Sequence, residues 1–94
     1  MQQVINRKLY DTDKAVLIAH NRYWDGNNFE RSGRNTYLYK GNNGNFFSSH
    51  ITLWQGERDH ILALSKKEAM DLYEDLPEQE MDFEEAFGIE LEEA

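Results

Sequence analysis

The sequence predicts a small α+β domain: an antiparallel sheet of about four strands with a central hairpin, two helices packed on one face and a short acidic C-terminal helix. Two local signals and the chain length support this class. β-rich segments flank the turn Gly41-Asn42-Asn43-Gly44, and a capping box at Ser65 begins an amphipathic helix. The 94 residues suit one core, expected over residues 1–77, with residues 78–94 as an acidic segment docked on that core or on a partner.

The first elements are expected to be a strand and a helix. Residues 4–10 begin with β-branched side chains and end before Asp11, a residue type that caps helices. Residues 24–34 contain Gly, Asn and Ser and predict a loop. Between them a helix is expected over residues 13–23, because apolar residues recur there at helical spacing (Ala15, Val16, Ala19 and Tyr23).

Three further strands are expected after the loop. The segments at residues 36–40 and 45–54 are rich in aromatic and β-branched side chains, and the Asn-Gly turn between them tolerates the positive φ angles of a tight hairpin. Residues 55–59 contain a Gly and several polar side chains, which predicts a second turn. Residues 60–64 then complete a sheet of about four strands.

Two helices are expected near the end of the chain. Ser65 and Glu68 can reciprocally satisfy two free N–H groups at the start of the first, which Pro77 ends. Residues 78–87 predict a shorter helix, with Gly88 as its C-terminal stop. A helix of this length is unstable in water by itself, so it must pack on another surface.

The charge of the chain is divided between its two parts. Residues 1–67 hold all ten Lys and Arg against six acidic residues, a net charge of +4, whereas residues 68–94 hold twelve acidic residues and no base, a net charge of −12. Negative charge repels phosphate, so the C-terminal segment is not expected to bind duplex DNA. The asymmetry predicts a protein partner with a basic surface, or else a purely solubilising role.

Composition also bears on location. The chain has no cysteine, whereas small secreted domains commonly depend on disulfides. It has no apolar run long enough to span a membrane, and residues 1–10 lack the apolar centre of a signal peptide. We therefore expect a cytoplasmic protein with no membrane partner, one that can also self-associate.

The acidic segment carries the residues expected to contact a partner. Its carboxylates alternate with apolar side chains, and Phe83 and Phe87 are spaced as neighbours on one helix face. Carboxylates can pair with Lys and Arg of a basic groove while aromatic rings anchor the helix, in this chain or on the partner. The expected function is non-enzymatic binding, without a cofactor or metal. The predicted contact residues are Glu80, Asp82, Phe83, Glu84, Glu85 and Phe87.

Two alternatives remain open from the sequence. Basic and aromatic residues interleave between residues 22 and 47, a pattern that can stack the bases of a single nucleic-acid strand. The candidates for such binding are Arg22, Trp24, Arg31, Arg34, Tyr37 and Tyr39. A less favoured alternative is a small nuclease or other hydrolase that uses His50, Glu57 and His60. The histidines lack metal-motif spacing such as H-x-x-x-H, and no phosphate-binding loop is present.

Three local patterns together resemble small prokaryotic proteins found on phages, plasmids and other mobile elements. They are Lys8-Leu9-Tyr10-Asp11-Thr12-Asp13-Lys14-Ala15, Leu38-Tyr39-Lys40 through Gly44-Asn45-Phe46-Phe47, and Leu64-Ser65-Lys66-Lys67-Glu68-Ala69 with Leu72-Tyr73-Glu74. Such families include anti-CRISPR proteins, which are short, acidic, cytosolic and non-enzymatic. The resemblance covers about residues 7–75 and implies an inhibitor of a nucleic-acid-handling complex, but it transfers no functional residue.

Overall fold

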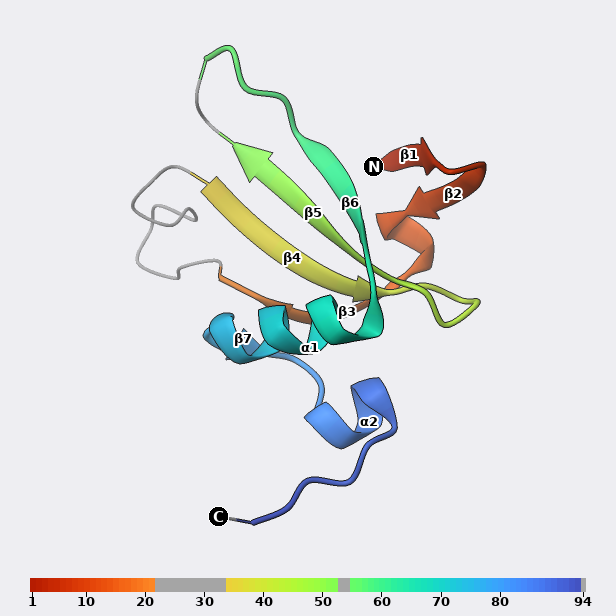
Figure 1. Cartoon of the computed structure of the whole chain (residues 1–94). Coiled ribbons are helices and arrows are strands. Elements are labelled where there is room, and N and C mark those ends of the chain that lie inside the picture. Colours follow the sequence, from red (N-terminus) through yellow and green to blue (C-terminus); the bar gives the residue numbers. More distant parts are fainter. Residues whose placement is uncertain (22–33, 53–54, 94) are drawn as a thin grey trace.

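The computed structural model describes residues 1–21, 34–52 and 55–93 (Figure 1). Within these residues the chain forms a five-stranded antiparallel sheet, a separate two-stranded hairpin and two α-helices. The elements are β1 (Gln2–Ile5), β2 (Lys8–Asp11), the 3-10 helix η1 (Thr12–Lys14), β3 (Val16–His20), β4 (Arg34–Lys40), β5 (Phe46–Thr52), β6 (His60–Leu64), α1 (Lys66–Asp75), β7 (Glu78–Gln79) and α2 (Phe83–Phe87). The α+β class is confirmed, but the described part contains seven strands rather than about four.

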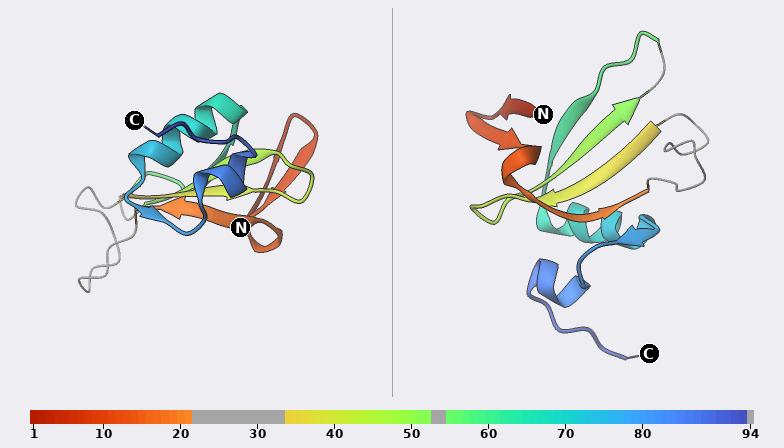
Figure 2. Two further views of the ribbon diagram at one scale, coloured as in Figure 1. Left: turned by 90° about the horizontal axis from the view of Figure 1, so that it is seen from below. Right: turned by 180° about the vertical axis from the view of Figure 1, so that it is seen from behind.

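The two faces of the five-stranded sheet pack on different elements. Phe46 and Phe47 are neighbours on β5, so their side chains point to opposite faces. Phe46 lies in a buried cluster with residues of α1 and α2, and Phe47 lies in a second cluster with Tyr10 of β2 and Ile61 of β6. Figures 1 and 2 place the β1–β2 hairpin and the C-terminal segment at opposite ends of the molecule.

The prediction of a helix over residues 13–23 is wrong within the described part of the chain. The single turn η1 is followed by β3, an interior strand between β4 and β7. A register shift between Leu17 and Ala19 marks a bulge, and the adjacent Ile18 and Ala19 are both fully buried. Interior strands commonly carry consecutive apolar residues, because both of their faces are buried. In β3 these apolar residues also fall at helical spacing, and the spacing therefore predicted a helix.

The strand expected over residues 4–10 is instead the hairpin of β1 and β2. Its turn residues Asn6 and Arg7 have φ angles of 50° and 65°. Two consecutive left-handed residues are typical of a type I′ turn, in which Gly usually takes one position. Because Arg occupies that position here, no residue pattern marks the turn. Val4 and Leu9 face each other across the hairpin.

The central hairpin is confirmed as β4 and β5. Gly44 has a φ angle of +84°, and its N–H donates to the carbonyl oxygen of Gly41 at 3.0 Å. The N–H of Gly41 in turn donates to the carbonyl oxygen of Asn45 at 2.8 Å. These bonds close the turn, and the positive φ at Gly44 explains why a residue without Cβ is needed there. The strand expected at residues 60–64 is confirmed as β6.

Helix α1 begins with the predicted capping box. The Oγ of Ser65 accepts a hydrogen bond from the N–H of Glu68 at 3.1 Å, and Oε1 of Glu68 accepts one from the N–H of Ser65 at 2.9 Å. These bonds also lower the pKa of the Glu68 carboxyl. The helix contacts β4, β5 and β6, with Ala69 and Tyr73 buried against the sheet.

Ser65→Ala removes the side-chain cap of α1, because Ala cannot accept the hydrogen bond from the Glu68 N–H. We expect the free energy of unfolding to fall by about 1 kcal/mol, as for other N-caps. Urea denaturation followed by circular dichroism measures the difference. Ser65→Asn keeps a capping oxygen and is the control: if it loses as much stability as Ser65→Ala, the cap does not stabilise α1 in the way described.

The single helix expected over residues 78–87 is interrupted. Its first two residues form β7, which extends the sheet beside β3. The N–H groups of Glu80 and Met81 then donate to the carbonyl oxygen of Ile18, at 2.8 and 3.2 Å. Only after these bonds does α2 begin, and Gly88 ends it in the left-handed conformation, as predicted.

The sheet has two different edges. At one edge β7 contributes only two residues, Glu78 and Gln79, and both are exposed. At the other edge β6 lies beside β1. There the side-chain oxygen of Gln3 accepts a hydrogen bond from the N–H of Ile61 at 2.9 Å. A backbone donor at the outer edge of β6 is therefore satisfied within the chain.

Candidate functional site

A groove of about 590 Å³ opens between α1, β7 and α2. We call it the acidic groove. It combines exposed carboxylates with two aromatic rings that are wholly or partly buried. The lining residues are Tyr73, Gln79, Asp82, Phe83, Glu84, Glu85 and Leu91. The combination of negative charge with an aromatic surface suits a cationic side chain.

Short contacts from α1 hold the two aromatic rings of the acidic groove in place. The hydroxyl of Tyr73 donates to the carbonyl oxygen of Met81 at 2.8 Å, and Nε2 of Gln79 donates to the carbonyl oxygen of Tyr73 at 3.1 Å. The rings of Tyr73 and Phe83 meet edge to face, with centroids 5.4 Å apart. The groove is therefore pre-formed in the free chain.

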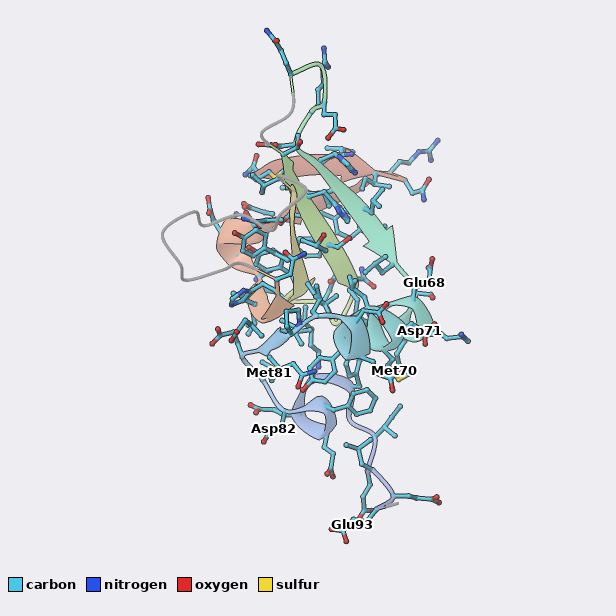
Figure 3. The ribbon with its side chains drawn as sticks, turned by 90° about the vertical axis from the view of Figure 1, so that its left-hand side faces the viewer. Glu68, Met70, Asp71, Met81, Asp82 and Glu93 are labelled. Carbon is cyan, nitrogen blue, oxygen red and sulfur yellow. The ribbon has the colours of Figure 1, made fainter. Side chains whose placement is uncertain are left out.

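Carboxylates lie on each element around the acidic groove, and α1 also carries Lys66 and Lys67, the second of which pairs with Asp71 at 3.0 Å. Figure 3 shows Asp82 beside α2, with Glu68 and Asp71 on α1 and Glu93 on the C-terminal segment. All four side chains are exposed. Burial, and secondarily the nearby Asp82 carboxylate, raises the pKa of the Tyr73 phenol, so this hydroxyl stays protonated and continues to donate at neutral pH. A cation entering the groove would meet no competing base among its lining residues.

Four of the six predicted contact residues line the acidic groove. Asp82, Phe83, Glu84 and Glu85 all line it. Phe87 does not: it is only 3% exposed and lies in the core of its own chain.

Glu80 also has a partner in its own chain. Its Oε1 lies 2.9 Å from Nε2 of His20. Glu80 thereby connects the segment after β7 to the end of β3, and Phe87 anchors α2. Both residues hold the segment on the core, leaving the groove residues to face outward.

The nucleic-acid candidates are only partly described. Arg22, Trp24 and Arg31 lie outside the described residues, and Arg34 begins β4. Tyr39 stacks on Phe47 with ring centroids 5.3 Å apart and planes within 15°. Tyr37 packs against His20 at 5.9 Å. One face of each tyrosine ring is thus used within the chain, and both side chains are half-buried.

The hydrolase candidates do come together. His50, Glu57 and His60 line a hollow of about 520 Å³ at the open end of β4, β5 and β6, together with Asn35, Thr36, Ile51, Thr52 and Arg58. We call it the histidine hollow. His50 and His60 are cross-strand partners whose rings stack, with centroids 4.8 Å apart. Burial, and then the neighbouring His60, lowers the pKa of His50, so its imidazole is neutral at pH 7.

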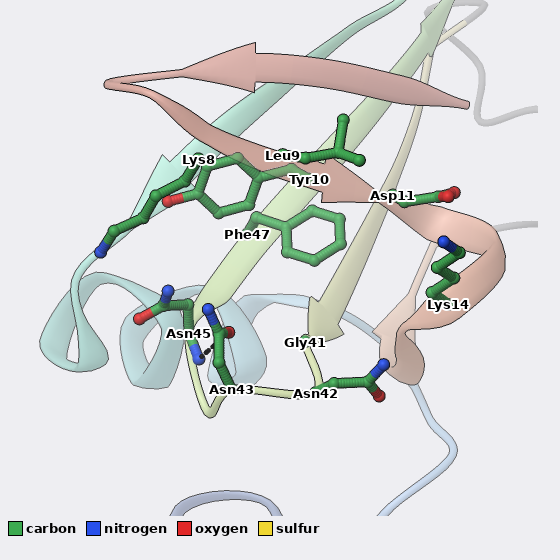
Figure 4. Close-up of a pocket in the computed structure, with 10 residues that line it drawn as sticks. All are labelled: Lys8, Leu9, Tyr10, Asp11, Lys14, Gly41, Asn42, Asn43, Asn45 and Phe47. Atoms are coloured by element: carbon green, nitrogen blue, oxygen red, sulfur yellow. Dashed lines mark hydrogen bonds between the residues drawn. The ribbon is translucent and has the colours of Figure 1, made fainter.

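A third and smaller hollow, of about 210 Å³, lies between the N-terminal hairpin and the β4–β5 turn. Figure 4 shows Lys8 and Lys14 at its two ends, with the amides of Asn42, Asn43 and Asn45 along one side. The aromatic rings beneath it belong to the buried cluster of Tyr10 and Phe47, which meet edge to face at 5.3 Å. These rings are used in packing.

Two lining residues of the acidic groove, Tyr73 and Gln79, are not among the contact residues predicted from the sequence. A Tyr followed by an acidic segment could have indicated a polar partner for its hydroxyl. Leu91 is one of the apolar side chains that alternate with the carboxylates of the acidic segment. The groove brings together residues from α1, β7, α2 and the chain after α2, and no local spacing reveals that arrangement.

Comparisons with protein-family models, with curated proteins and with solved structures gave no match. Among the described residues, none of the helices is long and apolar enough to cross a membrane. The same residues contain no group of three or more His, Asp or Glu side chains placed to hold one metal ion. We therefore infer function from the geometry of the acidic groove and of the histidine hollow.

Proposed function

We propose that the chain is a non-enzymatic binding protein whose acidic groove receives Lys or Arg side chains from a basic surface of a protein partner. One observation supports this most directly: three exposed carboxylates, Asp82, Glu84 and Glu85, share a pre-formed groove with two aromatic rings. The concentration of twelve acidic residues and no base in residues 68–94 adds a field that attracts such a surface over a longer range.

The aromatic rings decide whether such ion pairs give useful affinity. Exposed ion pairs contribute only about 0–1 kcal/mol each, because water competes for both charges. A cation that enters the groove also meets the ring of Phe83 and loses part of its hydration. Cation–π contacts add roughly 0.5–2 kcal/mol, more as water is excluded. Arg suits the site better than Lys because its flat guanidinium can stack on a ring and donate to a carboxylate together.

In its most specific form, the proposal is an inhibitor of anti-CRISPR type that occupies a basic surface of a nucleic-acid-handling complex. This form draws on the sequence resemblance together with the charge of the groove. A negatively charged protein surface can compete with phosphate for the same Lys and Arg side chains. The proposed partner is thus a protein, and the nucleic acid is the competitor.

Neutralising the groove tests the proposal. The triple variant Asp82→Asn, Glu84→Gln, Glu85→Gln keeps the size of each side chain, and Asp82 makes no side-chain cap bond to α2 that the change would remove. Three pairs of roughly 0.5 kcal/mol each correspond to about a tenfold loss of affinity. Fluorescence anisotropy with an Arg-rich peptide, and binding to purified CRISPR effector complexes, measure the change.

A second triple variant is the matched control. Glu90→Gln, Glu92→Gln and Glu93→Gln remove the same charge from the same segment, but none of these residues lines the groove. The proposal requires the groove variant to lose much more affinity than this control. If both variants lose the same affinity, binding depends on net charge alone and the groove is not the site.

A further inference from the structure

We propose that the hollow between the β1–β2 hairpin and the β4–β5 turn binds residues 89–93 of a second copy of this chain. The hollow has a volume of about 210 Å³, and we call it the lysine hollow because Lys8 and Lys14 lie at its two ends (Figure 4). None of its lining residues lines the acidic groove. The proposal therefore goes beyond the proposed function and does not depend on it.

The lysine hollow presents polar groups that make no hydrogen bond in the described part of the chain. Lys8 and Lys14 are exposed, and neither ammonium group makes a hydrogen bond or a salt bridge there. The side-chain N–H groups of Asn42, Asn43 and Asn45 likewise have no acceptor among the described residues. An Asn amide both donates and accepts, so it can bond the backbone of an extended peptide. Cations at the two ends and amides along one side suit an acidic peptide.

Asp11 is the one acidic residue among the described residues that line the lysine hollow. Its Oδ2 accepts a hydrogen bond from Nε2 of Gln2 at 2.9 Å, and its Oδ1 accepts one from the N–H of Asp13 at 2.9 Å. The bond from Gln2, and then the bond from Asp13, hold the pKa of the Asp11 carboxyl below its usual value. Asp11 is therefore charged at neutral pH, and incoming carboxylates should pair with the lysines at the ends instead.

An exposed apolar pair lies beside the polar groups of the lysine hollow. Val4 and Leu9 face each other across the β1–β2 hairpin and are 69% and 56% exposed. Leu9 also lines the hollow. Covering this pair removes apolar surface from water, which favours an occupant that carries apolar side chains as well as carboxylates.

Residues 89–93 have both kinds of side chain. Ile89 and Leu91 are 38% and 54% exposed, and they alternate with exposed carboxylates at positions 90, 92 and 93. Within the described part of the chain, residues 89–93 make no hydrogen bond, so their backbone groups can bond the amides of a neighbour. In an extended segment Ile89 and Leu91 point to the same side. They can then cover the apolar pair while the carboxylates meet the long lysine side chains.

The arrangement of the two surfaces favours a second copy over docking within one chain. Figures 1 and 2 show residues 89–93 leading away from the molecule, with the β1–β2 hairpin at the opposite end. Residues 1–14 hold three bases and two acids, whereas residues 89–93 hold three acids and no base. Two different surfaces meet in such a contact, so it can continue from copy to copy. The net charge of −8 opposes it, and the association is expected to be weak.

Sedimentation velocity of the full chain, between about 10 μM and about 1 mM, covers the affinity expected for a few exposed ion pairs and one apolar contact. We expect the average mass to rise above that of one chain as the concentration increases. The hollow variant Lys8→Gln, Lys14→Gln should weaken the association about fivefold, and the tail variant Glu90→Gln, Glu92→Gln, Glu93→Gln about tenfold.

Mixing the two variants tests whether these surfaces meet each other. The hollow variant keeps its acidic segment and the tail variant keeps its lysine hollow, so together they should form a one-to-one complex. In NMR spectra of the labelled tail variant, the side-chain amide signals of Asn42, Asn43 and Asn45 should shift when the unlabelled hollow variant is added. The same signals should stay in place when unlabelled tail variant is added instead.

Two further variants are matched controls. Lys66→Gln, Lys67→Gln removes the same positive charge from α1, away from the lysine hollow, and should leave the association unchanged. The groove variant Asp82→Asn, Glu84→Gln, Glu85→Gln should lose the Arg-rich peptide and still self-associate, so the two proposals can fail separately. A mass that does not depend on concentration, an equal loss in the Lys66 and Lys67 variant, or a loss in the groove variant alone would each overturn docking on the lysine hollow.

Discussion

Phe87→Ala is expected to lower the free energy of unfolding by about 3–5 kcal/mol, as for other buried Phe residues. The side chain is 3% exposed and meets three rings: Phe46 at 5.0 Å, Phe83 at 4.8 Å and Tyr73 at 5.8 Å. Its removal leaves a cavity where α2, α1 and β5 converge. A domain of this size commonly has only 5–15 kcal/mol in total, so the variant should be close to unfolding.

Urea denaturation of Phe87→Ala, followed by circular dichroism and tryptophan fluorescence, measures the loss. Phe83→Ala is the comparison, because Phe83 is only partly buried and packs at the margin of the same cluster. We expect Phe83→Ala to lower the free energy of unfolding clearly less than Phe87→Ala does. Equal and small losses in both variants would mean that α2 does not belong to the core, and the groove it helps to form would then lack a fixed wall.

A chain that ends at Pro77 is expected to lose cooperative folding. It lacks β7, and it lacks the N–H groups of Glu80 and Met81 that bond the carbonyl oxygen of Ile18. It also exposes the core surface that Ala86 and Phe87 cover. An interior strand would become an edge while an apolar face opened to water, and each change is unfavourable by itself.

Thermal unfolding and binding of an apolar dye distinguish the outcomes for the shortened chain. A broad transition with strong dye binding is expected. A sharp transition at the melting temperature of the full chain would show that residues 78–94 are dispensable for the fold. A chain ending at Gly88 retains β7 and α2 and serves as the control, because it loses only the residues after the α2 cap.

The sequence predicted those parts of the fold that depend on neighbouring residues. The turn at Gly44 requires a positive φ, and the cap at Ser65 requires a side-chain oxygen three residues before an N–H, so both are visible in a few letters. The segment Val16–His20 is different. Whether it is a strand or a helix depends on pairing with β4 and β7, and its local spacing favoured the wrong answer.

The candidate sites also have parts that depend on neighbouring residues and parts that depend on the tertiary structure. The acidic segment and its aromatic residues could be found from composition and spacing. The sequence does not show which of these residues are buried anchors, such as Phe87, and which line the groove, such as Glu84. That depends on which side of a five-residue helix meets the core. Likewise, His50 and His60 are ten positions apart, and only the register of β5 against β6 places them in contact.

The edges of the sheet affect how the protein behaves at high concentration. Exposed strands can recruit strands from other molecules and begin fibril growth. Here β7 has only two residues, both exposed, so an incoming strand could form few backbone hydrogen bonds with it. One of the two is Glu78, whose negative charge would repel the same edge of a second molecule. At the opposite edge, Gln3 occupies the donor of Ile61 that an incoming strand would need. The shortness of β7 at one edge of the five-stranded sheet and the side-chain amide of Gln3 at the other thus limit the addition of strands from other molecules.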